Sequence, residues 1–312
     1  MNAMDPKTDI PAPPVHKDNM KKGMAAGLTA FFLFAVMNVL AKMLSETHHV
    51  IEIAFYRNLI ATLPFLFIIF ALGRRDILVI RQKPGGILIR AVLGTISLVV
   101  TFAAFAAMPM ADATAFLFTS SLFIPALGYF FLKEQVGKYR WSAVVIGFVG
   151  VLIMLQPTGM VNAMGVTLAL SAAAMHATLQ TILRHLGKFE KPETITFYFV
   201  MIGTIVAALP LPFVARPPTM EEIPLLFGVG LTGALAQWML SIAYKNAPVS
   251  VVTVFNFSGI IWATIFGFVI WGDWPNSAIW IGGTIVIASN IFIVWRESRK
   301  RQMLDAEVEA KL

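Results

Sequence analysis

The chain has 312 residues, of which 58% are hydrophobic and only 13% are charged, whereas a soluble domain carries roughly 25% charged residues. Its mean hydropathy of +0.76 therefore excludes an ordinary soluble domain and indicates a protein embedded in a membrane. The absence of cysteine excludes disulfides and thiolate metal sites, and the net charge of +7 comes without any interleaved aromatic and basic motif for binding nucleic acid.

The N-terminal segment, residues 1–22, is polar and contains four prolines, so we expect a disordered cytoplasmic leader. It has neither an apolar core nor a small-residue cleavage site, and it is therefore not a secretory signal peptide. The segment from 296 to 312 is predicted to be a short cytoplasmic tail, either helical or frayed.

Between these ends the chain contains ten apolar runs, each of about the 17–25 residues that a membrane-spanning helix needs. They lie at about 23–44, 50–72, 85–107, 111–132, 138–156, 162–186, 193–214, 222–244, 249–271 and 275–295. The links between them are short, so no soluble domain fits there. The sequence predicts an all-α membrane protein.

The positively charged residues indicate the orientation of these helices. If the N-terminus is cytoplasmic, 20 Lys and Arg residues lie on the cytoplasmic side and one, Arg216, lies on the opposite side. Three more, Lys42, Arg57 and Arg90, fall within helices. We expect a multi-pass protein of the bacterial inner membrane with both termini in the cytoplasm.

The ten helices read as two copies of a five-helix unit. A shift of 142 residues aligns Phe55 and Tyr56 with Phe197 and Tyr198, and a shift of 139 aligns Pro109 with Pro248 and Trp141 with Trp280. Because five is an odd number, the second copy must be inverted relative to the first. Inverted repeats of this kind form many secondary transporters.

With these features the chain resembles the drug/metabolite transporter superfamily, in particular its EamA-like branch. The resemblance covers residues 23–295 and is carried by the segment 103–155, with Pro109, Pro125 and Glu134 at the positions of that branch's diagnostic stretch. It implies a first repeat at 23–156, a second, inverted repeat at 162–295, and transport of a small metabolite. Members of the family export amino acids and other metabolites or import compounds such as riboflavin or S-adenosylmethionine.

Polar and aromatic residues within the predicted helices are the candidates for substrate binding, because polar side chains at membrane depth face a cavity or a partner. The set comprises Asn38, Thr101, Thr114, Phe118, Ser121, His176, Gln180, Gln237, Trp238, Ser241, Tyr244, Asn256 and Phe257. Asn38 and Gln180 are repeat mates, that is, residues at equivalent positions of the two repeats, and are expected to present amides at equal depth. Pro64 and Pro125 are candidate hinges.

These candidate substrate-binding residues carry almost no fixed charge, which suits a neutral or zwitterionic, partly apolar substrate. We expect Lys42, Arg57 and Arg90 to lie near helix ends, where Lys42 complements the helix dipole. Arg57 is open to two interpretations, an ion pair with Glu52 or a contact to substrate.

Other residues also have structural interpretations. His176 could form a hydrogen bond between helices, and Asn38 and Gln180 could join helices through amide contacts. Glu134 and Asp273 are expected to cap the helices that follow them.

The sequence contains no HExxH, GxSxG or paired intramembrane aspartates, so an intramembrane enzyme is disfavoured, and ion-channel filters and charged rings are absent. We predict a transporter without a cofactor or metal, whose partners are a small molecule and the lipid bilayer. Gly147, Gly150, Gly282 and Gly283 suggest close packing of helices 5 and 10 or a homodimer formed through them. Export of an amino-acid-like metabolite is the favoured function. Uptake of a riboflavin- or S-adenosylmethionine-type compound is the alternative.

Overall fold

The computed structural model describes residues 20–123, 127, 138–154, 162–186, 189–246, 252 and 255–309. Throughout these ranges the regular structure is helical and no strand occurs. Predictions on the leader before residue 20 and on Pro125 and Glu134 fall outside the described residues.

The helices follow one another through short links. The first group is α1 (Met20–Leu44), α2 (Val50–Phe70), the 3₁₀ helix η1 (Arg75–Leu78), α3 (Pro84–Ala107), α4 (Met110–Leu117) and α6 (Lys138–Met154). The second group is α7 (Ala163–Leu186), α8 (Pro192–Ala208), α9 (Leu211–Val214), α10 (Ile223–Asn246), α12 (Ser258–Trp271) and α13 (Ser277–Glu309).

Five of these helices contain segments long and apolar enough to cross a membrane: Met20–Leu44, Val50–Phe70, Pro84–Ala107, Ala163–Leu183 and Ile223–Leu240. Five shorter apolar helical segments accompany them, at Met110–Phe123, Trp141–Met154, Pro192–Ala208, Ser258–Trp271 and Ser277–Phe292. Large apolar side chains also cover the outside of the bundle, as Phe213, Leu209 and Val269 show with exposures of 89%, 72% and 73%. A surface of this kind is stable in lipid and would aggregate in water.

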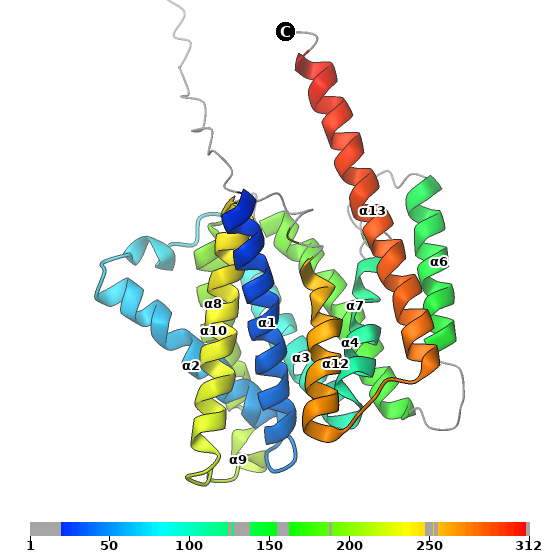
Figure 1. The fold of residues 1–312 in the computed structure, drawn as a ribbon. Coiled ribbons are helices and arrows are strands. Elements are labelled where there is room, and N and C mark those ends of the chain that lie inside the picture. Colours follow the sequence, from blue (N-terminus) through cyan, green and yellow to red (C-terminus); the bar gives the residue numbers. More distant parts are fainter. Residues whose placement is uncertain are drawn as a thin grey trace, which may run out of the picture.

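The helices pack in pairs that join the first group to the second. α1 packs on α10 and α3 on α7, while α2 lies against both α8 and α10. α4 packs on α12, and α6 lies beside α13 at one side of the bundle (Figure 1). The start of α1 and the C-terminal end of α13 lie on the same side of the molecule (Figure 1).

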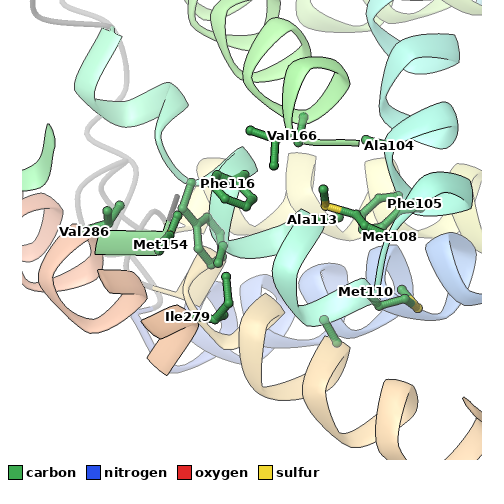
Figure 2. Packing of buried hydrophobic residues seen from close by; sticks show 14 of the residues in the cluster. Ala104, Phe105, Met108, Met110, Ala113, Phe116, Met154, Val166, Ile279 and Val286 are labelled. Atoms are coloured by element: carbon green, nitrogen blue, oxygen red, sulfur yellow. The ribbon is translucent and has the colours of Figure 1, made fainter. Parts of the chain in front are cut away.

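The largest apolar core surrounds α4. Phe105 and Met108 from the α3 end, Phe116 from α4, Met154 from α6 and Val286 from α13 are all buried there (Figure 2). This cluster connects α6 and α13 to the rest of the bundle. It also includes Phe118 and Phe257, two of the predicted site residues.

Glycine allows α6 and α13 to approach each other closely. A Cβ atom added at Gly150 would lie 2.7 Å from the carbonyl oxygen of Gly282, which is closer than van der Waals contact permits. These glycines therefore serve a contact within one chain. Homodimer formation through the same helices remains a prediction.

Several element boundaries differ from the sequence predictions. Met20–Lys22, assigned to the leader, belong to α1, and α13 continues without a break to Glu309 through the predicted tail. The predicted helix 193–214 is divided at Pro210 into α8 and α9, because proline removes a backbone donor and clashes with the preceding turn. α2 by contrast runs through Pro64 as one helix.

Candidate functional site

Thr101 on α3 and His176 on α7 are the first two predicted site residues that the fold brings together. Thr101 Oγ1 lies 3.3 Å from His176 Nε2, and the Thr101 hydroxyl donates to the carbonyl oxygen of Ser97 at 2.7 Å. Because a hydroxyl carries only one proton, Nε2 of His176 must donate in the shared contact. The hydrogen bond joins α3 to α7 and leaves Nδ1 of His176 as an acceptor. The structural interpretation of His176 and its role as a site residue are thus compatible.

Phe118 and Phe257 form the second contact between predicted site residues. Their rings meet edge to face with centroids 5.5 Å apart. Each residue lies in a turn that interrupts a helical segment: α4 ends at Leu117, and α12 begins after Phe257. The 139-residue shift relates these two interruptions. Irregular backbone at membrane depth is tolerated where it is buried in protein or lines a cavity, and paired helix breaks in two repeats are typical of transporter binding sites.

The other predicted site residues are not brought together in this way. Asn38 is half-buried and Gln180 is exposed, so the two amides differ in environment despite their repeat relationship. Neither makes a hydrogen bond to another residue in the described part of the chain, which disfavours the interpretation that they join helices. Trp238 is 61% exposed.

The remaining candidates are placed as follows. Thr114 donates its hydroxyl to the Met110 carbonyl at 2.7 Å. Ser121, Gln237 and Asn256 are half-buried. The side chains of Ser241 and Tyr244, like Pro125, lie outside the described residues.

Arg57 and Arg90 form a cationic centre whose convergence the sequence did not predict. Both guanidinium groups lie over the Phe199 ring of α8, with their Cζ atoms 5.7 and 4.5 Å from its centroid. Arg57 is only 2% exposed, and its Nη1 donates to Asn58 Oδ1 at 2.8 Å. Gly94 provides the space for this arrangement, because a Cβ atom there would lie 2.8 Å from the Phe199 ring.

This cationic centre corrects the expectation that the interior has almost no fixed charge. Arg57 and Arg90 start from backbone positions in the first halves of α2 and α3, but their long side chains converge in the interior. Glu52 does not pair with Arg57; its carboxylate lies 3.0 Å from His48 instead. A charged residue at the centre of a membrane helix costs about 2.5–3.5 kcal/mol on insertion scales and usually has a functional role.

Lys42 and Asp273 have structural roles at the end of α1. Lys42 donates to the Met108 carbonyl at 3.0 Å, lies 3.7 Å from Asp273 and contacts the Trp271 ring. Asp273 was expected to cap the last helix, but Asn276 does so, with Oδ1 accepting from the Ile279 N–H at 2.9 Å. The expectation for Asp273 is therefore wrong. α13 begins at Ser277, so Asn276 and not Asp273 directly precedes the helix.

Comparison with known proteins decides the family. The sequence model of the EamA-like transporter family matches the chain twice, over residues 21–156 and 163–295. The chain belongs to the EamA-like transporter family. It is thus a multi-pass membrane protein whose relatives are named transporters.

Three relatives show the range of this EamA-like group. The pseudopaline exporter CntI of Pseudomonas aeruginosa is 29% identical over 278 residues, covering 88% of this chain and 96% of the relative. The riboflavin transporter of Vibrio cholerae is 30% identical over 277 residues, covering 88% and 93%. The S-adenosylmethionine uptake transporter of Rickettsia bellii is 24% identical over 285 residues, covering 89% and 96%.

The fold also matches a solved structure. A crystal structure of a protein with 16% sequence identity superposes with a TM-score of 0.63, covering 89% of this chain and 98% of that chain. At this identity the likeness concerns the fold alone.

The first of two loop clusters in this EamA-like chain surrounds His48 and includes Glu52, Arg216, Thr219 and Glu222. The two ring nitrogens of His48, which is 3% exposed, lie 3.0 Å from Glu52 and 3.1 Å from Glu222. The Thr219 backbone N–H donates to Glu222 at 2.8 Å. That N–H and the Thr47 hydroxyl hold the pKa of Glu222 at about 2. The cluster joins the α1–α2 link to the start of α10.

The second cluster surrounds Glu190, between α7 and α8. Its carboxylate accepts backbone N–H groups from Arg81, Gln82 and Lys83 at 2.9, 2.8 and 2.8 Å. Burial raises the pKa of Glu190, but these three donors outweigh burial and the pKa lies below its usual range. The Glu190 cluster therefore holds the link between η1 and α3. Neither cluster was predicted from the sequence, although the spacing of four between His48 and Glu52 was a usable signal.

Proposed function

We propose that the chain is a secondary transporter in which two inverted five-helix repeats move a small metabolite by alternating access. Contacts between repeat mates support this proposal most directly. The 142-residue shift relates Arg57 to Phe199, and the 139-residue shift relates Phe118 to Phe257; in both pairs the two mates touch. In a two-fold arrangement a residue meets its own mate only near the axis, so both pairs mark an axis through the interior.

Packing of whole helices supports the same arrangement. The repeat relates α1 to α7, α2 to α8 and α3 to α10. The contact of α1 with α10 therefore corresponds to that of α7 with α3. The contact of α2 with α10 corresponds in the same way to that of α8 with α3. Two related gates then arise at opposite ends of one central region, which is how inverted repeats give alternating access.

The orientation we propose follows the positive charges, with both termini in the cytoplasm of a bacterial cell and the protein in the inner membrane. The described ends of the chain lie on one side of the bundle (Figure 1), in agreement with this proposal. A cysteine introduced at the exposed Phe213 is expected to react with a membrane-impermeant maleimide in intact cells. Reaction only after lysis would contradict the orientation.

For the substrate we propose a small, partly apolar, amino-acid-like metabolite that is exported. Similarity to the pseudopaline exporter over most of both chains supports export. Similarity to the riboflavin transporter of Vibrio cholerae, at 30% identity, favours uptake as the second candidate. Asn38, His176, Gln180 and Trp238 are the proposed contacts to substrate, with Thr101 positioning His176.

The test measures direction and site together. Cells that overproduce the protein are expected to tolerate toxic amino-acid analogues better than cells with an empty vector, and the analogue should appear unchanged in the medium. Chemical conversion of the analogue would indicate an enzyme, and greater sensitivity would indicate uptake. Substitution of Asn38 or His176 by Ala is expected to remove the tolerance, whereas the exposed Ser171→Ala on α7 should retain it.

The oligomeric state is a separate proposal. The outward faces of α6 and α13 carry exposed apolar residues such as Val145, Leu152 and Ile281, and we propose that a homodimer forms through them. Light scattering of the protein in detergent should give the mass of two chains. The mass of one chain, unchanged on dilution, would contradict a stable dimer.

A further inference from the structure

The cationic centre on α2 and α3 contains several buried hydrogen-bond donors that have no partner in the described part of the chain. They are Nε of Arg57, Nε and Nη1 of Arg90, and Nδ2 of Asn58. Asn58 is fully buried, and its acceptor Oδ1 already receives the bond from Arg57. Every unpartnered polar atom in this group is therefore a donor.

No described carboxylate neutralises these cations. Glu52, the nearest acidic residue along α2, is held by His48, and neither arginine forms an ion pair with any other described residue. Phe199 attracts both guanidinium groups through its ring face but offers no lone pair to their N–H groups. The site thus has positive charge and free donors without an acceptor.

An oxyanion is the ligand that satisfies both requirements. A carboxylate offers two oxygens with about four lone-pair positions and matches the planar fork of an arginine. A neutral hydroxyl or amide would satisfy a single donor and leave the charge uncompensated. Phe199, which both cations contact, adds an aromatic neighbour for the carbon skeleton of an organic acid.

We propose that Arg57, Arg90 and Asn58 bind the carboxylate of the transported molecule, so that the substrate class is small organic carboxylates. The assignment of this ligand as cargo rests on the proposed transport function, whereas the binding site itself does not. Arg57 contacts its repeat mate Phe199, so the site lies near the proposed two-fold axis, where both gates can reach it.

The test compares an acid with its neutral amide. The melting temperature of the purified protein in detergent is measured with potassium phenylacetate, with phenylacetamide and with potassium chloride at equal ionic strength. At saturating phenylacetate we expect a rise of about 3 °C or more, and no rise with the amide or chloride. Equal shifts with the acid and the amide, or no shift with either up to 100 mM, would overturn the proposal.

Substitutions place the effect at the site. Arg57→Gln and Arg90→Gln should each abolish the phenylacetate shift, whereas Arg75→Gln, which removes one exposed charge on η1, should keep it. Arg90→Lys keeps the charge without the planar fork and should retain a reduced shift. A phenylacetate shift that survives both glutamine substitutions would place the ligand elsewhere and refute the assignment.

Failure of the site and failure of the transport function give different results. Saturable flux in liposomes that is unchanged by Arg57→Gln and Arg90→Gln would leave the transporter in place and remove the carboxylate site from it. A carboxylate shift that both substitutions abolish, in a protein without flux for any carboxylate, would keep the binding site and contradict its role in transport.

Discussion

The His48 cluster and the Glu190 cluster hold together links at opposite ends of the bundle, and they do so with different chemistry. In Figure 1 the α1–α2 link and α9 lie at the bottom, whereas η1 and the start of α8 lie at the top. The 142-residue shift relates His48 to Glu190, and the 139-residue shift relates Glu222 to Lys83. Related positions in the two halves are thus used for the same purpose at the two ends.

The two clusters differ in whether they hold backbone or side-chain groups. Glu190 accepts three consecutive backbone N–H groups and so determines the shape of the 81–83 segment. The ring nitrogens of His48 instead meet the side chains of Glu52 and Glu222, which can separate while the backbone keeps its shape. We infer that the His48 cluster joins side chains whereas the Glu190 cluster fixes backbone, and the substitutions below measure what each contributes to stability.

The largest effect is expected from His48→Leu. It leaves the fully buried side chain of Glu52 without its partner, and removing one member of a buried salt bridge costs about 3–5 kcal/mol. The melting temperature in detergent should fall by several degrees, whereas His185→Leu at an exposed position should have little effect.

A double substitution, His48→Leu with Glu52→Leu, should recover most of the lost stability, because it removes the stranded charge as well. If the double variant is no more stable than His48→Leu, then lost packing explains the effect and the stranded carboxylate does not.

Glu190→Gln is expected to have the next largest effect. The amide keeps one acceptor oxygen but turns its NH2 group toward a backbone N–H, and a lost charge-assisted hydrogen bond is worth about 1.5–3 kcal/mol. Limited proteolysis should then cleave near Arg81 and Lys83 faster than in the unaltered protein. Glu193→Gln, at an exposed position of α8, is the matched control, and equal cleavage in both variants would contradict the role of Glu190.

Acid should weaken both clusters. The folded-state pKa of Glu222 is about 2, below the usual value near 4.5 for glutamate, so its contribution to stability is complete above pH 4.5 and is lost as the pH falls toward 2. The pKa of Glu190 is also lowered, so its contribution has the same sign. Glu222→Gln should therefore make the melting temperature less dependent on pH between 4.5 and 2. An unchanged pH dependence would show that Glu222 does not carry this stability.

Hydropathy predicted the apolar segments well, because it reports a local property of the chain. It did not predict the turns at Phe118 and Phe257, since no glycine or proline occurs at either residue. These interruptions are stabilised by the contact between the two rings and by Asn290, which donates to the Phe118 carbonyl at 3.4 Å. Both are tertiary interactions that a single segment does not reveal.

Depth along a helix was a poor guide to the position of long side chains. Arg57 and Arg90 were placed near helix ends by counting residues, yet their guanidinium groups meet on Phe199. By contrast, the contact of Thr101 with His176 joins two residues that were selected because both are polar and lie within apolar helices. Sequence therefore selected one pair of polar residues that touch, and it paired charges poorly, because ion pairs depend on the relative placement of helices.

The smallest effect is expected from Arg216→Gln, at the rim of the His48 cluster. Its guanidinium group lies 3.5 Å from Glu222, but half of the side chain is exposed, and exposed ion pairs contribute little. The melting temperature should fall by less than about 2 °C, and the difference should vanish in 1 M salt, where the screening length is about 3 Å. The loss caused by His48→Leu should persist in the same salt, because Glu52 is shielded from solvent. If salt abolished both effects alike, the contacts of His48 with Glu52 and Glu222 would be as accessible to solvent as the contact of Arg216 at the rim, and burial would not explain the larger effect of His48→Leu.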